Sequence, residues 1–256
     1  MIDKYICGII MIIDKLQIIR KIVQSAFFIK FVIISAVFSI PFCLCFFGFV
    51  EQYILVGSIY FVSTLVVMVL ITLLLGRVFC GWMCPLGFIF DLTYKLRVKL
   101  FKLKKLPELP ENIHNKLKYL KYIIMILSLI AVYHFSTYAY CSVCPIGALT
   151  NLSGTLISFI ILILAIILGF IYPMAFCRYL CPLGAFLGIF SIFPIFQLKL
   201  TDKCVKCKLC NKKCPTQIKL TEKVEQSECI RCFECMTACK KGTIEYKPFF
   251  KNSKKE

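Results

Sequence analysis

Cysteines repeat at metal-binding intervals near the end of this chain. The segments CVKCKLCNKKCP, beginning at Cys204, and CIRCFECMTAC, beginning at Cys229, each read C-x2-C-x2-C-x3-C. Three closely spaced thiolates can reach adjacent irons of one cubane, whereas the fourth, which we expect at a helix start, reaches the other cluster. The predicted ligands of two 4Fe-4S clusters are Cys204, Cys207, Cys210 and Cys239 for the first, and Cys229, Cys232, Cys235 and Cys214 for the second. A zinc ribbon is the alternative, but eight cysteines in two matching quartets exceed the need of one zinc site.

A second pair of cysteine motifs repeats almost residue for residue. FCGWMCPLG spans residues 79–87 and FCRYLCPLG spans residues 176–184. Cysteines at i and i+4 share one helical face, and the proline that follows ends or bends the helix. The four thiols fit an iron-sulfur centre, a site for another metal or a transient dithiol relay, and simple packing of small side chains at helix ends is the structural alternative. These residues are Cys80, Cys84, Cys177 and Cys181.

The composition around these motifs is that of a membrane protein. Hydrophobic residues make up 60% of the chain and its mean hydropathy is +0.84, above the apolar usage of soluble domains. A helix needs about 20 mostly apolar residues to cross a bilayer. Four such stretches are Phe27–Phe47, Tyr53–Leu75, Tyr122–Tyr140 and Leu156–Phe176. Tyr179–Leu198 is also uncharged, but its prolines and glycines predict an interfacial helix and linker instead.

The distribution of charge predicts how these spans are oriented. All but one of the 31 lysines and arginines lie before residue 31, between residues 95 and 121, or after residue 177. By the positive-inside rule, both termini and the basic loop face the cytoplasm of a multi-pass cytoplasmic-membrane protein. This topology accounts for the net charge of +18, so nucleic acid is not expected as a partner. The lysine-rich loop is predicted to lie on anionic membrane lipid.

Four further cysteines are expected at the outer edge of the membrane. Spans one and three run outward, and they deliver Cys43, Cys45, Cys141 and Cys144 to that side. The four either bind another iron-sulfur centre or form disulfides in an oxidising outer compartment. His134 lies two turns before Cys141 and is a candidate quinone or proton site, with a packed histidine bonded to a tyrosine or serine as the alternative. His114, in the basic loop, carries no functional expectation.

The ordered set of motifs resembles a known family. A basic entry to span one that contains Gln24, the Cys80/Cys84 motif, Asp91, the basic loop, the Cys177/Cys181 motif and the double ferredoxin motif follow one another from Arg20 to Tyr246. The same order is found in polytopic ferredoxin-type proteins with paired C-x3-C-P motifs. These include the NapH subunit of periplasmic nitrate reductase systems and the membrane part of nitrous-oxide reductase regulators. The resemblance implies that electrons pass between the quinone pool and redox partner proteins.

Together these patterns predict an α-helical integral membrane protein with four transmembrane helices and a C-terminal α+β bacterial ferredoxin-like domain. The expected layout is an N-terminal amphipathic segment over 1–24, a membrane domain over 25–198 with its basic loop at 91–121, a ferredoxin-like domain over 199–247 and a basic tail over 248–256. We expect two 4Fe-4S clusters, with one or two further centres at the membrane edges.

No acid–base dyad, nucleophile elbow or phosphate loop is visible, which favours an electron carrier over a hydrolase or transferase. The family resemblance implies a quinol-dehydrogenase-like electron-transfer subunit rather than a stand-alone enzyme. The alternative is an assembly or regulatory protein that reduces a metal ion or senses redox state while a respiratory enzyme matures.

Overall fold

The computed structural model describes most of the chain. The described residues are 15–30, 50, 53–54, 57, 59–101, 110–135, 143–150, 155–222, 224–239 and 241–249. Their helices are the helix 15–30, α3 (Ile59–Leu75), α4 (Val78–Trp82), α5 (Pro85–Phe101), α6 (Glu111–Leu117), α7 (Leu120–Phe135), α8 (Pro145–Thr150), α9 (Leu156–Ile171), α10 (Ala175–Tyr179), α11 (Pro182–Phe190), α12 (Leu209–Lys213) and α13 (Glu234–Ala238). The strands are β1 (Phe196–Leu200) and β2 (Ile244–Pro248).

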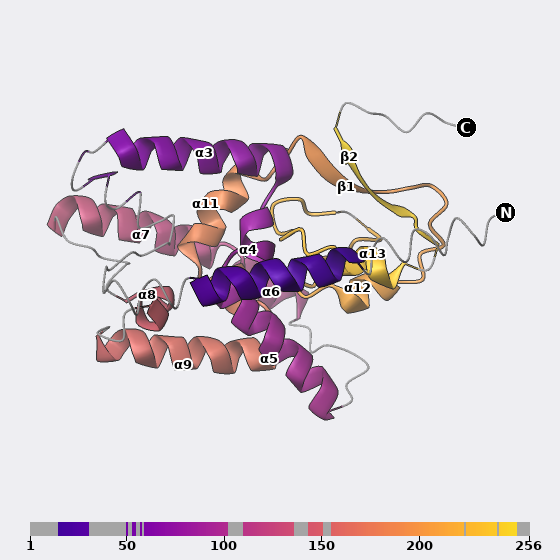
Figure 1. Ribbon diagram of the computed structural model, residues 1–256, viewed down its shortest axis with the longest axis horizontal. Helices are drawn as coiled ribbons and strands as arrows, with labels where there is room; N and C mark the ends of the chain where they lie inside the picture. Colours follow the sequence, from indigo (N-terminus) through magenta and orange to yellow (C-terminus); the bar gives the residue numbers. More distant parts are fainter. Residues whose placement is uncertain are drawn as a thin grey trace.

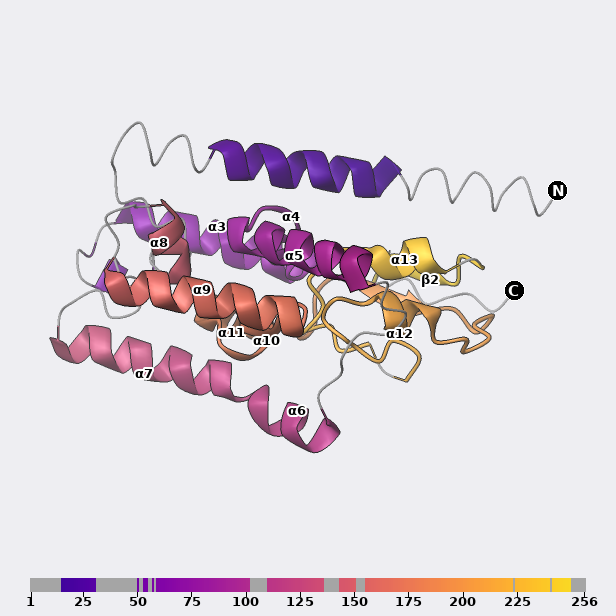
Figure 2. The ribbon, with the colours of Figure 1, turned by 90° about the horizontal axis from the view of Figure 1, so that it is seen from below.

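The long helices form one end of the molecule and the cysteine-rich C-terminal module forms the other (Figures 1 and 2). Helix α3 ends at the module, because the Tyr246 hydroxyl donates a 2.9 Å hydrogen bond to the Leu75 carbonyl. Helix α7 begins there, because Lys121 in its first turn pairs with Glu228 of the module. Helix α9 runs in the same direction as α3 and leads into α10 (Figure 2). Both C-x3-C motifs therefore follow helices that end at the module.

Among the described residues, one helix is long and apolar enough to cross a membrane, and it covers Ile113–Phe135. Val62–Leu75 and Leu156–Ile171 are apolar helices of shorter length. Most of the predicted first span and the predicted outer cysteines Cys43, Cys45 and Cys141 lie outside the described residues.

The stretch Tyr179–Leu198 forms a short helix, a turn and the beginning of a strand. Helix α11 has nine residues, or about 14 Å at 1.5 Å per residue, which is half of the hydrocarbon thickness. Pro182 occupies its first turn and the Cys181 sulfur caps it by accepting from the Gly184 amide at 3.4 Å. The helix packs against both α7 and α3, with Leu183, Ala185 and Leu187 buried.

The C-terminal module is a small α+β ferredoxin-like domain. Strands β1 and β2 pair antiparallel, with Phe196 opposite Pro248 and Leu200 opposite Ile244. Helices α12 and α13 pack against one another and bring the two cysteine motifs together. Since β1 begins at Phe196, three residues before the boundary expected at 199, the module includes the end of the predicted linker.

Candidate iron-sulfur sites

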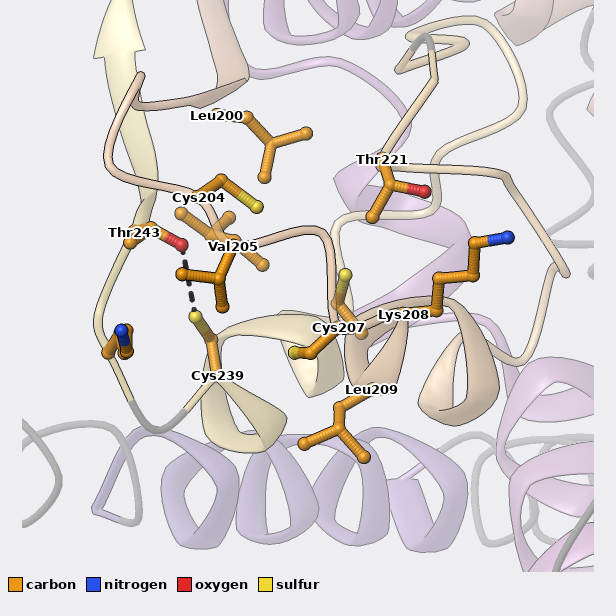
Figure 3. Close-up of a pocket in the computed structure, with 12 residues that line it drawn as sticks. Leu200, Cys204, Val205, Cys207, Lys208, Leu209, Thr221, Cys239 and Thr243 are labelled. Atoms are coloured by element: carbon orange, nitrogen blue, oxygen red, sulfur yellow. Dashed lines mark hydrogen bonds between the residues drawn. The ribbon is translucent and has the colours of Figure 1, made fainter.

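The first ferredoxin quartet surrounds one cavity. Cys204, Cys207, Cys210 and Cys239, here called site I, line a space of about 220 Å³ together with Val205, Leu209 and Lys208. Figure 3 shows that Cys204 and Cys207 line this cavity from the loop before α12 and that Cys239 lines it from the end of α13. Cys207 is exposed and Cys210 is buried. The structure thus places Cys239, from the second motif, beside the three cysteines of the first.

The second quartet is enclosed by protein. Cys214, Cys229, Cys232 and Cys235, here called site II, are all buried. The thiols of Cys214, Cys229 and Cys232 interact electrostatically with one another and with Cys235. The fourth cysteine of each motif therefore lies with the first three cysteines of the other motif, as the spacing predicts. That all eight bind clusters stays a prediction.

The backbone of both motifs is shaped as a cradle. Lys206 and Lys208 flank Cys207 with φ of 51° and 60°, and Arg231 and Phe233 flank Cys232 with φ of 54° and 58°. Residues with side chains rarely adopt this left-handed conformation. It turns successive amide N–H groups into concave nests of the kind that bind anionic groups, including iron-sulfur clusters. The left-handed conformation occurs at the same two positions in both motifs, and this arrangement fits a cluster in each site.

The helix position of the fourth cysteines differs from the expectation. Cys214 follows the last residue of α12 and Cys239 follows the last residue of α13, so each ends a helix rather than starting one. Both have extended backbone, which turns the chain away from its own motif. A short helix that contains the third cysteine and ends just before the fourth supplies the separation that lets the fourth reach the other site.

The two C-x3-C motifs fold alike. In each, the amide of the second cysteine donates to a carbonyl five residues earlier, from Cys84 to Phe79 at 3.0 Å and from Cys181 to Phe176 at 2.9 Å. The glycine three residues later packs so tightly that an added Cβ would lie 2.6 Å from the Cys80 carbonyl oxygen at Gly87, and 2.7 Å from the Cys177 carbonyl oxygen at Gly184. The repeated sequence therefore produces a repeated structure.

The four cysteines of these motifs, here called the edge site, lie together. Cys177 interacts electrostatically with Cys80, Cys84 and Cys181. Burial raises the pKa of the Cys84 thiol to about 12 and that of Cys181 to about 11. Without a metal these two thiols are protonated at neutral pH, and coordination to a metal removes the proton.

A buried arginine accompanies the edge site. Arg77 lies close enough to Cys80, Cys177 and Cys181 to interact with them electrostatically. It is 1% exposed, and its Nε has no hydrogen-bond partner within the part of the chain that the structure describes. A guanidinium buried beside four sulfurs suits an anionic cluster in this position.

The edge site and site II meet at Gly81. A Cβ at Gly81 would overlap the carbonyl oxygen of Ile230, which lies between Cys229 and Cys232. Trp82 donates from Nε1 to the Arg231 carbonyl at 2.9 Å. Ile230 and Cys232 belong to the same apolar core as the edge-site cysteines. Only a residue without a side chain permits this approach, so the first motif is the one that faces the ferredoxin module.

Residues that carried the family resemblance converge on the same junction. The Gly81 carbonyl accepts from Arg20 Nε at 3.0 Å and from Gln24 Nε2 at 2.8 Å. Arg20 also pairs with Asp91 at 3.6 Å and with Glu234 at 3.3 Å. The helix 15–30, where the boundary at residue 24 was expected, is continuous and fastens the first motif to the module.

A second ionic cluster ties the module to the helices. Glu228, next to Cys229, pairs with Lys121 of α7 and lies 3.7 Å from Arg77. Burial alone would raise the pKa of the Glu228 carboxyl, but the neighbouring cations Arg77 and Lys121 hold it below its usual value. The carboxylate is therefore ionised, as two buried cations require.

His114 has a structural role that its position in the sequence did not indicate. Its Nε2 lies 2.9 Å from Arg178 Nη2 and its Nδ1 lies 2.9 Å from the Tyr179 hydroxyl. Arginine can only donate, so Nε2 accepts and Nδ1 carries the proton. The neutral ring thus joins α6 to the second C-x3-C motif. The one available signal was Arg178, a charged residue where the first motif has glycine.

Cys144 and His134 are the remaining predicted site residues that the structure describes. Cys144 is buried just before α8, at the end of the helices away from the module (Figure 2). His134 is exposed in the last turn of α7 and its ring lies 5.8 Å from that of Phe135. In the described ranges, no three His, Cys, Asp or Glu side chains have the spacing of ligands to a single metal ion.

Two iron-sulfur family models match the chain. One, described as a 4Fe-4S binding domain, matches residues 58–104, 120–160 and 154–200. The other, described as a 4Fe-4S dicluster domain, matches residues 195–247. The first model covers both C-x3-C motifs and also the segment that contains Cys141 and Cys144.

Relatives resemble the chain over much of its length. It is similar to the uncharacterized protein MJ0750 of Methanocaldococcus jannaschii, with 61% identity over 93% of this chain and 98% of the relative. YccM of Escherichia coli, named as an electron transport protein, is 33% identical over 68% of this chain and 52% of the relative. The ferredoxin-type protein NapH of Haemophilus influenzae is 24% identical over 73% of this chain and 68% of the relative. No solved structure matches the chain.

Proposed function

Because the chain belongs to the NapH/NosR-like family of iron-sulfur membrane ferredoxins, we propose that it carries electrons across the edge of the cytoplasmic membrane. Electrons pass between the quinone pool, or a partner at the outer face, and a cytoplasmic redox partner. The route within the chain runs through three sites: the edge site, site II and site I. The chain makes and breaks no bonds in a substrate of its own.

Four membrane spans, with both termini and the module in the cytoplasm, are part of this proposal. The apolar side chains that α3, α7 and α9 leave exposed support it, for example Val67 at 53%, Leu127 at 60% and Leu164 at 58%. Exposed apolar surface of this extent marks contact with lipid or another protein. The lysines and arginines at the module ends of these helices support the orientation.

The contact at Gly81 is the observation that carries the proposed route. Electron tunnelling falls steeply with distance, so neighbouring centres must lie against one another. The edge site and site II share a core, and Gly81, the residue after Cys80, packs against the backbone of Ile230. Site I, with its exposed Cys207, is then the terminal centre on the cytoplasmic side.

The residues at each site have separable tasks. A 4Fe-4S cluster, where bound, supplies one-electron redox chemistry. The eight module cysteines and the four edge-site cysteines would hold such clusters. Arg77 offsets the negative charge of the edge site, and the core around it excludes water. The outer cysteines, of which the structure describes only Cys144, extend the route as a further centre or stabilise that face as disulfides.

Re-oxidation from within the bilayer tests the route. Purified protein in nanodiscs is reduced with dithionite, freed of excess reductant and exposed to a long-chain quinone confined to the lipid, while electron paramagnetic resonance follows the module clusters. We expect rapid loss of the reduced signals in the wild type and slow loss in Cys84→Ser. Both proteins should respond equally to a water-soluble oxidant. Equal rates with the lipid quinone would refute a route through the edge site.

A further inference from the structure

Site I opens onto the surface, whereas site II does not. Cys207 is exposed and Cys204 and Cys239 are half-buried, while every site II cysteine is buried. An electron that leaves the module for another protein must therefore leave from site I, since that is where a partner's centre can come nearest. The surface around Cys207 is then the place where a partner docks.

This surface has an apolar centre and a basic rim. Val205 and Leu209, on either side of Cys207, are 58% and 40% exposed and line the site I cavity (Figure 3). Four exposed lysines, each within two residues of a site I cysteine, border it. These are Lys203, Lys206, Lys208 and Lys241, here called the site I lysines. A small apolar centre with a charged rim is the usual anatomy of a protein interface.

Among the described residues, the site I lysines have no acidic partner. Within the described residues, none of the four forms a salt bridge, although Lys219 and Glu222 nearby do pair, at 4.0 Å. The loop 201–222 contains six lysines against Asp202 and Glu222. Unpaired lysines around an electron-transfer centre attract a partner of opposite charge and orient it during encounter.

We propose that the site I surface docks a small acidic one-electron carrier protein. This inference rests on the proposed function and names the class of its cytoplasmic partner. The carrier's acidic face meets the site I lysines, its apolar centre meets Val205 and Leu209, and its redox group faces Cys207. One electron passes between the carrier and site I; no bond forms or breaks and no proton moves. The complex is transient, as electron-transfer encounters with small interfaces usually are.

Stopped-flow reduction tests the docking surface. Cluster-loaded protein in nanodiscs of neutral lipid is mixed with a reduced acidic 2Fe-2S ferredoxin as the probe carrier, over a series of salt concentrations. The variant is Lys203→Gln and Lys241→Gln, which removes two site I lysines that are not part of the backbone cradle around Cys207. The matched control removes the same charge elsewhere, from two other exposed lysines: Lys99→Gln and Lys116→Gln. An uncharged reduced flavin serves as the small reductant that needs no docking.

We expect the rate constant for the ferredoxin to fall about tenfold at low salt in the variant and to change little in the control, because local charge steers the encounter. The difference should vanish at high salt, where a Debye length of a few ångströms screens it. The rate with the flavin should be the same in all three proteins. A basic c-type cytochrome, used as an acceptor, should show the reverse dependence on salt.

Other outcomes overturn the inference. Equal slowing in variant and control would mean that net charge alone attracts the carrier. An effect that appears only in nanodiscs of anionic lipid would mean that the lysines bind lipid headgroups. If the flavin cannot reduce the module clusters at all, the proposed function fails as well; if it can and the ferredoxin rate ignores the lysines, the docking surface alone is wrong.

Discussion

Replacing Gly81 with alanine should separate the ferredoxin module from the edge site. The added Cβ would overlap the backbone oxygen of Ile230, and neither backbone can move freely, since the Gly81 carbonyl accepts hydrogen bonds from Arg20 and Gln24. Overpacking of this kind costs about 1–3 kcal/mol. Weakening the two hydrogen bonds adds about 1 kcal/mol. A total of about 2–4 kcal/mol raises the population of the undocked loop about 30- to 700-fold, at 1.4 kcal/mol per factor of ten.

Hydrogen–deuterium exchange of the cluster-loaded protein measures this population. Amides of residues 229–236 should exchange faster in Gly81→Ala by about the same factor. Gly188→Ala is the matched control, because its Cβ would lie 3.4 Å from the Tyr122 hydroxyl and 3.6 Å from the Ser227 carbonyl, which is ordinary contact. Alanine there should be neutral or stabilise α11 by up to about 1 kcal/mol. Wild-type exchange in Gly81→Ala, with unchanged iron content, would show that the loop does not rest on this glycine.

Three further substitutions test the ionic, metal and histidine parts of the site. Glu228→Gln should destabilise the protein by about 3–5 kcal/mol in chemical denaturation, because it strands buried cations, and adding Lys121→Met should recover part of the loss; no recovery would contradict the pairing. Cys84→Ser should lower iron and sulfide per chain by one cluster while the module signals persist, and unchanged iron would exclude an edge cluster. His114→Phe should cost about 1–3 kcal/mol in thermal unfolding by leaving Arg178 without its acceptor, whereas His114→Gln should recover most of it; equal losses would count against that hydrogen bond.

The predictions that agree with the structure depend on local spacing. A C-x2-C-x2-C-x3-C run carries its geometry in its own few residues, so the placing of Cys239 with the first motif and Cys214 with the second could be anticipated. The similar folding of the two C-x3-C motifs followed from their near identity. The expected helix start at Cys214 was wrong because spacing constrains where a thiol must reach, and says less about which short helix supplies the distance.

The predictions that were missing depend on pairing between distant segments. Arg77 and Lys121 read as ordinary basic residues near membrane boundaries, yet both are buried with Glu228, which is more than 100 positions away in sequence from Lys121. No local pattern predicts such a pair, because neither residue can be assigned a partner until the fold brings the two segments together. His114 was overlooked for the same reason, since its partners Arg178 and Tyr179 lie in another helix.

One departure within the repeat did contain this information. The motifs FCGWMCPLG and FCRYLCPLG agree at their cysteines, prolines and final glycines, and they differ at the position after the first cysteine, Gly81 in one and Arg178 in the other. The ferredoxin module packs its backbone directly against the first motif, and this close contact requires a residue without a side chain at the position after the first cysteine. The other is free to use the position for a long side chain, which here reaches His114. Where a repeat is otherwise kept, a glycine in one copy opposite a large residue in the other therefore indicates which copy faces the neighbouring domain, and in this chain it indicates that the first motif contacts the ferredoxin module.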